Sequence, residues 1–282
     1  MRISLIIPTV NAGLNIERLL TSLLEQDVQP EEVIVIDSSS EDNTVGTAER
    51  LGARTIVIPR HEFNHGGTRN MAAMSAKGDT LLFMTQDAMP YNKEFVRKLI
   101  VPLEMPDIAA AFGRQMPGPD ASPLDAFLRK FNYPEKSMVK GLDDVGRYGV
   151  KTFFFSNVCS AIKKDLFIKA GMFPDVRANE DMLIAAKLIL DNYKVAYVHD
   201  AMVIHSHDYS LPEQFMRYYN IGSSLRRNKW VLEYARVEDE GIRFIREQIG
   251  SVVRGRKYFW VPYIFLEYMA KYAGYKIGFI AG

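Results

Sequence analysis

The chain has one cysteine, Cys159, among its 282 residues. An intramolecular disulfide is therefore excluded, and so is a metal site built from several cysteines. Such a low cysteine content is typical of proteins that work in the reducing cytosol. With 48% hydrophobic residues, the chain can bury a substantial core, and we expect an ordinary globular protein.

Long apolar runs are also missing. The first run, Ile3–Ile7, is stopped by Pro8, so it is too short for a signal peptide and indicates a buried strand. No run approaches the roughly 20 apolar residues of a membrane span. We expect a cytoplasmic protein that is soluble or attached peripherally to a membrane.

The sequence has no large excess of charge of either sign. Its 35 Lys/Arg and 34 Asp/Glu residues give a net charge of +1, which argues against a nucleic acid partner. The charge is unevenly distributed, because residues 214–282 carry 12 basic and 6 acidic side chains. The last quarter of the chain is therefore its basic part.

The first hundred residues alternate apolar runs with amphipathic helical patterns. The predicted strands are Ile3–Ile7, Val33–Asp37, Arg54–Ile58 and Thr80–Met84, and the predicted helices are Asn15–Leu24, Thr44–Leu51, Gly66–Ala76 and Glu94–Val101. This alternation predicts an α/β fold with a mostly parallel sheet that helices cover on both faces. The ligand crevice of such a sheet lies at the carboxyl ends of the strands.

The second half of the chain is less regular. Residues 115–150 carry four prolines and four glycines, which indicates an irregular insertion over the substrate. Further core elements are predicted at Thr152–Ser160, from Lys163, at Asn179–Leu190, and near Val195 and Val203. The pattern beyond Leu211 is helical. We therefore divide the chain into residues 1–210 and a helical C-terminal region, 211–282.

Two acidic residues follow predicted strands, where a ligand site is expected. Asp37 can accept hydrogen bonds from a ribose or a base, and Asp42 can cap the next helix. Asp87 can hold a divalent metal ion against a diphosphate. A capped turn and a loop carboxylate explain the same residues without any ligand.

Three further motifs have both a functional and a structural interpretation. Asn64–Asn70 opens a helix with two glycines and Arg69, which suits an anionic ligand or a tight loop. Glu180 and Asp181 favour the first turn of a helix through its dipole, or supply a general base. If the segment His205–His207 is extended, its two imidazoles lie on the same side. They are then either metal ligands or structural, hydrogen-bonding groups.

Aromatic residues are dense near the C-terminus, where nine of the 22 residues from Tyr258 to Phe279 are aromatic. A helix of this composition packs as a core element or homodimer contact, or lies at a membrane interface. In the membrane interpretation, Phe259, Trp260 and Tyr263 sit at the headgroup level, and the basic side chains contact anionic lipid.

In combination these motifs resemble glycosyltransferase family two, whose members have the nucleotide-sugar-binding GT-A fold. Ile7–Thr9 resembles the first strand and loop of the family, and Asp37–Thr44 stands where many members have DDGSxDxT. Gln86–Ala88 stands at the DxD position, and Glu180–Asp181 matches the ED motif. The resemblance covers the predicted catalytic domain, residues 1–210.

Several motif variants resemble those of bacterial rhamnosyltransferases of polysaccharide assembly. They are Ile36–Ser40, Phe63–Asn70, Thr85–Ala88, His205–Tyr209, Gln214–Phe215 and Arg217–Tyr218. The sequence departs from the family pattern at Ser38, which replaces the second acid of DDG, and at Asp87, which alone represents the acids of DxD.

The resemblance implies inverting transfer of L-rhamnose from dTDP-β-L-rhamnose to a hydroxyl of a lipid-linked glycan acceptor. It implies that Asp181 is the general base, with Glu180 as its neighbour and alternative. It also implies that Asp87, with His207, binds Mg²⁺ or Mn²⁺. The residues expected to contact the donor are Thr9, Asp37, Ser39, Arg69 and Gln86.

Two other classes of protein share parts of this pattern. A sugar-phosphate nucleotidyltransferase is expected to have a basic, glycine-rich loop after its first strand, but Pro8–Gly13 has no basic residue. A noncatalytic module that binds a glycan or a nucleotide would not require an acid at Asp181. An assay of nucleotide release in the presence of acceptor separates this module from an enzyme.

Overall fold

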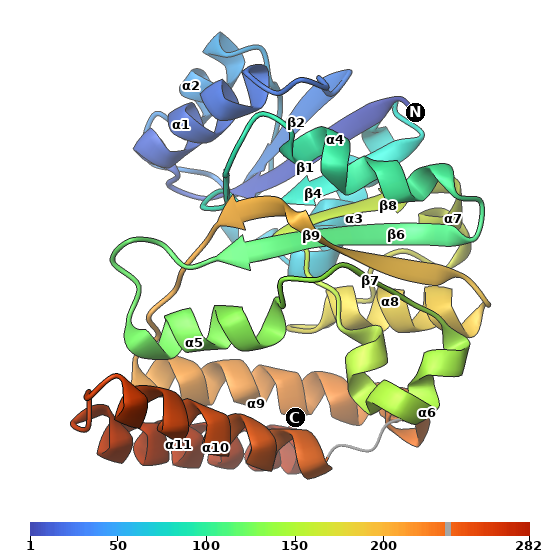
Figure 1. Cartoon of the computed structure of the whole chain (residues 1–282). Helices are drawn as coiled ribbons and strands as arrows, with labels where there is room; N and C mark the ends of the chain where they lie inside the picture. The colour runs from blue at the N-terminus through green and yellow to red at the C-terminus, as the bar shows by residue number, and fades with distance from the viewer. Residues whose placement is uncertain (235–237) are drawn as a thin grey trace.

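A computed structural model describes residues 1–234 and 238–282 (Figure 1). The strands are β1 Ile3–Thr9, β2 Glu32–Asp37, β3 Arg54–Val57, β4 Thr80–Met84, β5 Met89–Pro90, β6 Ile108–Met116, β7 Met138–Lys140, β8 Cys159–Lys163 and β9 Lys194–Ile204. The α-helices are α1 Gly13–Leu24, α2 Thr44–Arg50, α3 His65–Ser75, α4 Phe95–Ile100, α5 Pro123–Asn132, α6 Val145–Tyr148, α7 Lys164–Lys169, α8 Glu180–Leu190, α9 Leu211–Arg227, α10 Glu238–Arg254 and α11 Trp260–Ala281.

The strands form one sheet in the order β3-β2-β1-β4-β8-β6-β9-β5, and β7 pairs with β9. Strands β3, β2, β1 and β4 are parallel, and β8 runs antiparallel to both β4 and β6. The expected α/β fold is confirmed, and its sheet is mixed: the first four strands in the order are parallel, and β6 and β9 form a second parallel pair. Because β1 and β2 are in parallel register, Thr9 lies beside Asp37 at their carboxyl ends.

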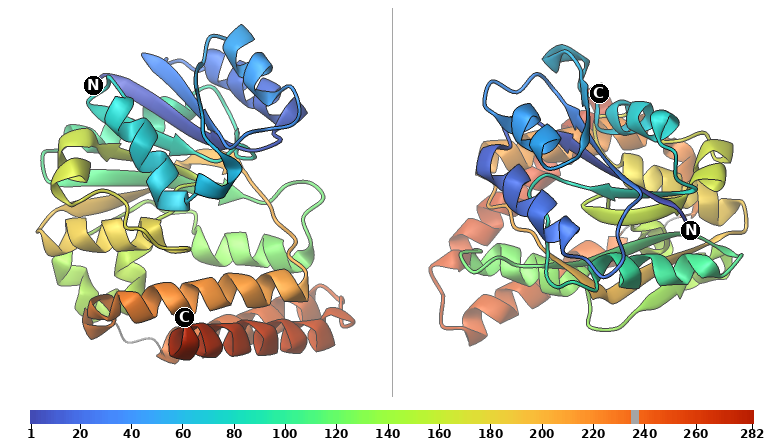
Figure 2. Two further views of the ribbon diagram at one scale, coloured as in Figure 1. Left: turned by 180° about the vertical axis from the view of Figure 1, so that it is seen from behind. Right: turned by 90° about the horizontal axis from the view of Figure 1, so that it is seen from above.

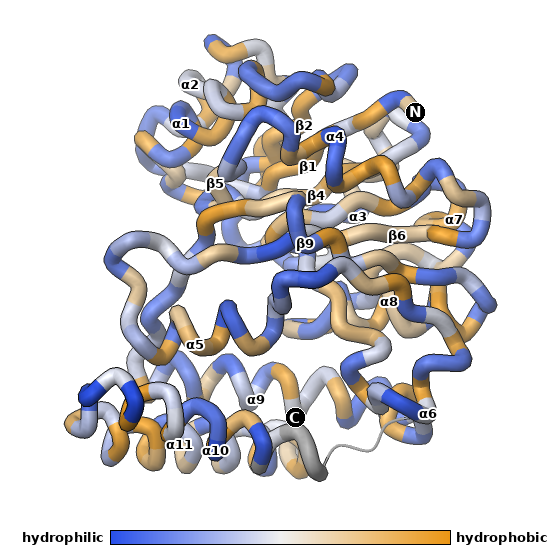
Figure 3. Tube along the Cα trace, viewed as in Figure 1, coloured by the Kyte–Doolittle hydropathy of each residue, from blue (hydrophilic) through white to orange (hydrophobic). Residues whose placement is uncertain are grey.

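Two apolar clusters, one on each face of the sheet, hold the fold together. Strand β1 alternates between them, since Leu5 and Ile7 join the cluster under α1 and α4, whereas Ile6 joins the cluster against α3 and α8. This alternation follows from the two-residue repeat of a strand whose two faces are both covered. Figure 3 shows the hydrophobic residues along the central strands and the hydrophilic residues on outer turns.

The prediction of an irregular insertion over residues 115–150 was wrong. This stretch contains α5 and β7, and the strand before it, β6, was not predicted. Helix α5 has Pro123 in its first turn, where a helix tolerates proline because the missing N–H would have no partner within the helix. The Ser122 hydroxyl caps this helix by accepting a hydrogen bond from the Asp125 N–H. The two strands expected near residues 195 and 203 are one strand, β9.

Helices α9, α10 and α11 form a layer at the end of the molecule farthest from β1 and β2 (Figures 1 and 2). Helices α9 and α11 approach closely because glycines face the partner backbone. A Cβ atom on Gly278 would lie 2.0 Å from the carbonyl oxygen of Tyr219. Helix α9 starts at Leu211, next to the expected boundary at residue 210, although the division into two domains stays a prediction.

None of the helices in residues 1–234 and 238–282 is long and apolar enough to cross a membrane.

Candidate active site

Asp37 organises the loop that joins β2 to α2. Its Oδ2 accepts hydrogen bonds from the Thr9 hydroxyl at 2.8 Å and the Ser40 hydroxyl at 2.6 Å, and its Oδ1 accepts one from the Ser40 N–H at 2.7 Å. Asp37 and Thr9 are both buried. They hold the loop rigidly, and their contact with the donor stays a prediction.

Two other residues expected to contact the donor lie at the same edge of the sheet. Ser39 is exposed and has a positive φ of 54°, and its hydroxyl donates to the carbonyl of Ile58 at 2.8 Å. The Gln86 amide accepts from the Val10 N–H at 2.8 Å and donates to the Val10 carbonyl at 3.1 Å. The Gln86 bonds connect the loops that follow β1 and β4, and the Ser39 bond connects the loop after β2 to the residue that follows β3.

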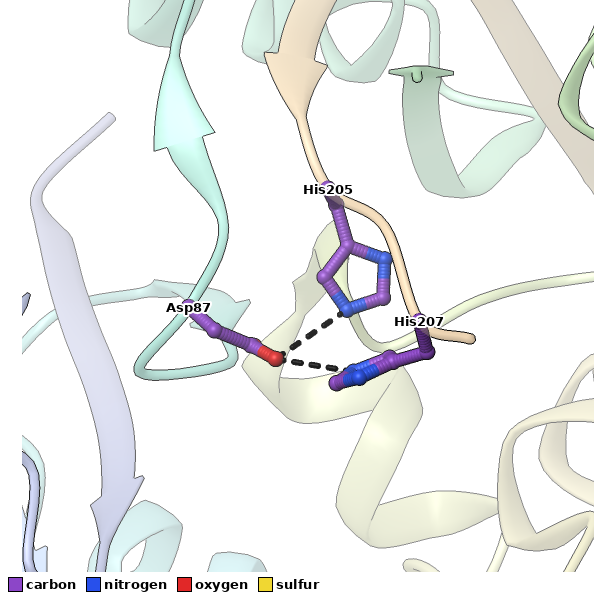
Figure 4. A group of neighbouring side chains, drawn as sticks. All are labelled: Asp87, His205 and His207. Carbon is purple, nitrogen blue, oxygen red and sulfur yellow. Dashed lines mark ion pairs between the residues drawn. The ribbon is translucent and has the colours of Figure 1, made fainter. Parts of the chain in front are cut away.

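Asp87 and two histidines converge at the end of β9 (Figure 4). The Asp87 Oδ2 lies 2.8 Å from the His207 Nε2 and 3.5 Å from the His205 Nε2. The three ligand atoms lie within 4.8 Å of one another. The predicted pairing of Asp87 with His207 thus appears in the structure, and His205 joins it because alternate residues of an extended segment point the same way.

The chemistry of this cluster suits a divalent metal ion. Burial opposes ionisation of Asp87, but hydrogen bonds with His205 and His207 outweigh it and hold the pKa of Asp87 well below its usual range. Burial lowers the pKa of His205, which favours the neutral imidazole that a metal requires. The His205 Nδ1 lies 3.0 Å from the Gln115 Oε1, so Gln115 orients the ring, as partners of metal-bound histidines do.

The two acids at the start of α8 have different surroundings. Glu180 is buried, and its Oε1 lies 3.7 Å from the Arg69 Nη1 and 3.3 Å from the Asn157 Nδ2. Asp181 accepts a hydrogen bond from the Met182 N–H at 2.8 Å. Burial, together with the negative charge of Glu180, raises the pKa of Asp181 to about 7. Asp181 therefore has the pKa of a general base that works near neutral pH.

Arg69 lies beneath α8 with a side chain that is 4% exposed. Its Nη1 donates to the carbonyl oxygen of His65 at 2.8 Å, and its charge partly offsets the effect of Glu180 on Asp181. The structure thus assigns Arg69 a contact with the acid pair that the sequence did not predict. Its expected contact with the nucleotide stays a prediction.

Asp181 and the histidine cluster face the same cavity. This cavity, which we call the reaction cavity, has a volume of about 500 Å³, and Asp87, His205, His207 and Asp181 are among its lining residues. A candidate base and a candidate metal site thus share one space of the size that small-molecule sites have.

Residues 4–171 match the sequence pattern of glycosyl transferase family 2. The chain belongs to glycosyl transferase family 2. It is therefore a glycosyltransferase, and the sequence resemblance is confirmed.

Two relatives from Salmonella match the glycosyltransferase over almost its whole length. The O-antigen chain rhamnosyltransferase RfbN of Salmonella typhimurium is 40% identical, over 99% of this chain and 90% of its own. The O-antigen chain rhamnosyltransferase WbaN of Salmonella anatum is 38% identical, over 98% of this chain and 88% of its own.

Solved structures share the fold of the glycosyltransferase. A mannosyltransferase from Pyrobaculum calidifontis, determined in complex with GDP-Man and Mn²⁺, superposes with a TM-score of 0.66 at 18% identity and covers 99% of this chain and 87% of its own. The TarS glycosyltransferase of Staphylococcus aureus, residues 1–349, superposes with a TM-score of 0.60 at 18% identity, covering 100% of this chain and 91% of its own. These likenesses confirm the GT-A fold.

Proposed function

We propose that this glycosyltransferase transfers L-rhamnose from dTDP-β-L-rhamnose, with inversion, to a hydroxyl of a lipid-linked glycan during O-antigen assembly. The observation that carries the proposed chemistry is the shared reaction cavity of Asp181 and the Asp87–His205–His207 cluster. The sugar is supported by the nearly full-length similarity to two rhamnosyltransferases.

In the proposed reaction, a carboxylate oxygen of Asp181 removes the proton from the acceptor hydroxyl. The oxygen of that hydroxyl forms a bond to the anomeric carbon of the donor, and the bond from this carbon to the diphosphate breaks, so dTDP leaves with the electron pair. A single displacement of this kind inverts the anomeric carbon. It needs one base and no strong acid, because a diphosphate is a good leaving group.

Glu180 has a supporting role in this proposal. It forms an ion pair with Arg69, and its charge helps to raise the pKa of Asp181. An ionised carboxylate next to the base thus raises the basicity of Asp181 and would stabilise the protonated form that the reaction produces.

Asp87, His205 and His207 would hold the divalent ion. Two nitrogens and one oxygen suit Mn²⁺ better than Mg²⁺, which prefers oxygen ligands. When bound, such an ion would neutralise the charge that develops on the leaving diphosphate.

The donor is proposed to extend from the reaction cavity toward the carboxyl ends of β1 and β2. There the exposed residue Ser39 and the Gln86 amide would contact the nucleoside, and the bond of Asp37 with Thr9 would keep the loop in place. Arg69 would hold Glu180 in place beside the base, and its contact with the nucleotide is part of the proposal.

The assay that tests this function measures nucleotide release from dTDP-β-L-rhamnose, UDP-glucose, UDP-N-acetylglucosamine and GDP-mannose. Each donor is tested with Mn²⁺, with Mg²⁺ and with EDTA. We expect the highest kcat/KM for dTDP-β-L-rhamnose with Mn²⁺. A higher value for any other donor contradicts the proposed sugar.

A peripheral contact with the membrane is proposed for the C-terminal region. Phe265, Leu266 and Met269 are exposed on α11, and the loop before this helix holds exposed Arg256 and Lys257. An apolar strip beside basic side chains suits an anionic lipid surface. Flotation with phosphatidylglycerol vesicles at low salt, lost at high salt, would support this contact, whereas a homodimer in solution without flotation would replace it.

A further inference from the structure

A second cavity adjoins the reaction cavity on the side of the C-terminal helices. Its volume is about 400 Å³, and α5, α9, α10 and α11 contribute to its walls. The residues that line both cavities include His207, Tyr209 and Lys271. The two spaces are therefore neighbours, and a ligand in the second cavity would extend to the reaction centre.

Besides the two carboxylate oxygens of Asp125, which forms an ion pair with Arg129, three buried oxygen atoms in the walls of this second cavity have no hydrogen-bond partner among the described residues. They are the Oε1 atoms of Gln214 and Gln248 and the Oε2 atom of Glu267. The three residues are only 7%, 2% and 6% exposed, respectively. Because buried polar atoms are normally hydrogen-bonded, three unpaired acceptors around one cavity indicate a ligand that donates hydrogen bonds.

The acceptors are held in position by their neighbours. The other carboxylate oxygen of Glu267, Oε1, accepts from the Gln214 Nε2 at 3.0 Å and lies 2.7 Å from the Lys271 Nζ. Glu267 and Lys271 neutralise each other, and Asp125 pairs with Arg129 at 3.1 Å. The cavity thus has no surplus of positive charge, which argues against a phosphate or diphosphate ligand.

Aromatic rings form another part of the wall. Trp260, Tyr263 and Phe244 line the second cavity, and the Trp260 and Tyr263 rings meet edge to face at 5.7 Å and 89°. Both side chains are half-buried. Of the three aromatic residues expected at the membrane headgroup level, Phe259, Trp260 and Tyr263, only Phe259 is exposed.

This combination matches a neutral sugar ring. A pyranose has apolar C–H faces that pack on aromatic rings, and hydroxyl groups around its edge that donate hydrogen bonds. Specific pockets for small ligands combine an apolar wall with a few fixed polar groups in this way.

We propose that the second cavity is a subsite of the acceptor glycan, which binds a neutral sugar residue next to the one that receives the transferred sugar. This inference rests on the proposed function, since it requires a glycan acceptor. The C-terminal helices would then select the acceptor, while the carboxyl ends of β1, β2 and β4 bind the donor. The two sites lie on opposite sides of the histidine cluster.

A binding experiment without donor tests the subsite directly. The chain has two tryptophans, Trp230 and Trp260, so Trp230→Phe leaves a single fluorescent reporter, in the cavity wall. The probes are the octyl glycosides of glucose, galactose, mannose, rhamnose and N-acetylglucosamine. We expect at least one to change the Trp260 emission saturably, and no change with any of them overturns the proposal.

Two variants show whether the binding uses the cavity. In the Trp230→Phe background, Gln248→Leu removes an unpaired acceptor and Tyr263→Ala removes a ring. Each is expected to raise the Kd of the bound glycoside by about tenfold, as the loss of one buried contact does. Tyr272→Ala is the matched control, because Tyr272 is 65% exposed on the same helix. An equal effect of Tyr272→Ala and Tyr263→Ala overturns the subsite.

A kinetic experiment separates this inference from the proposed function. With a disaccharide acceptor that carries the bound sugar next to its terminal residue, Tyr263→Ala should raise the acceptor KM and leave the donor KM and the slow hydrolysis of donor unchanged. A raised donor KM with an unchanged acceptor KM assigns the cavity to the donor and refutes the subsite. If dTDP-β-L-rhamnose is not the donor, the donor panel shows it, while the fluorescence titration still reports on the subsite. The melting temperature of each variant shows whether it is folded. If Gln248→Leu does not fold, Tyr263→Ala still tests the subsite.

Discussion

Replacing Asp181 by asparagine should separate three properties of the glycosyltransferase: turnover, donor affinity and stability. Asparagine keeps the size of the side chain and removes its basicity. We expect transfer to fall by roughly 10²–10⁴-fold, the usual contribution of a general base. The Kd of the donor should change little, because the base acts on the acceptor hydroxyl.

The raised pKa of Asp181 also predicts that Asp181→Asn is more stable than the wild type above about pH 4. The ordinary pKa of 3.8 rises to about 7 in the folded protein, so the folded state binds the proton more tightly than the unfolded state does. The resulting cost is absent below about pH 4, grows as the pH rises from 4 to 7, and is complete above pH 7. Three pKa units correspond to about 4 kcal/mol. Since solvent reaches part of the side chain, we expect Asp181→Asn to stabilise the protein by about 2 kcal/mol at pH 8.

The assay is thermal unfolding of the wild type and Asp181→Asn at pH 4.5 and pH 8, together with single-turnover transfer. The Tm of the variant should exceed that of the wild type by several degrees at pH 8 and by much less at pH 4.5. Asp191→Asn, at the exposed far end of α8, is the control and should change neither property. An unchanged rate of transfer refutes the role of Asp181 as base, and an equal Tm difference at both pH values refutes its raised pKa.

Three further predictions concern other parts of the molecule. Asp87→Ala should weaken donor binding strongly in Mn²⁺ and little in EDTA, as titration calorimetry can show; an equal loss in both conditions means that the carboxylate acts without a metal. Arg69→Gln leaves a buried carboxylate unpaired, so it should lower the free energy of unfolding by roughly 3 kcal/mol in urea titrations, and a loss below about 1 kcal/mol would mean that the ion pair is unimportant. Gly278→Ala places a Cβ atom 2.0 Å from the Tyr219 carbonyl and should cost about 1–3 kcal/mol. Gly241→Ala on α10, where no described atom would lie within 4 Å of the new Cβ, should not destabilise, and equal costs for the two variants would contradict the close approach of α9 and α11.

Much of the N-terminal half could be predicted, because strands buried on both faces appear in the sequence as continuous apolar runs. Strand β6 was not predicted because it contains three consecutive alanines, Ala109–Ala111, and alanine is neither β-branched nor aromatic, as residues typical of strands are. Helix α5 was hidden by prolines, although Pro123 stands in its first turn, where proline is tolerated.

The candidate site was predictable as far as local motifs allow. The resemblance assigned Asp87, His207 and Asp181 from motifs that are far apart in the sequence, and these three residues line one cavity. The pairing of Arg69 with Glu180 and the second cavity depend on how distant helices pack. Such contacts leave no periodic signal in a single sequence, so they required the structure.

The initial anomer of the sugar released from dTDP-β-L-rhamnose tests the central claim most directly. In the absence of a glycan, water takes the place of the acceptor hydroxyl, and ¹H NMR follows the product before its anomers equilibrate. A direct displacement with Asp181 as base predicts α-L-rhamnose as the first product and its loss in Asp181→Asn. Release of β-L-rhamnose first, or of neither anomer by a folded wild-type protein with Mn²⁺, would contradict it.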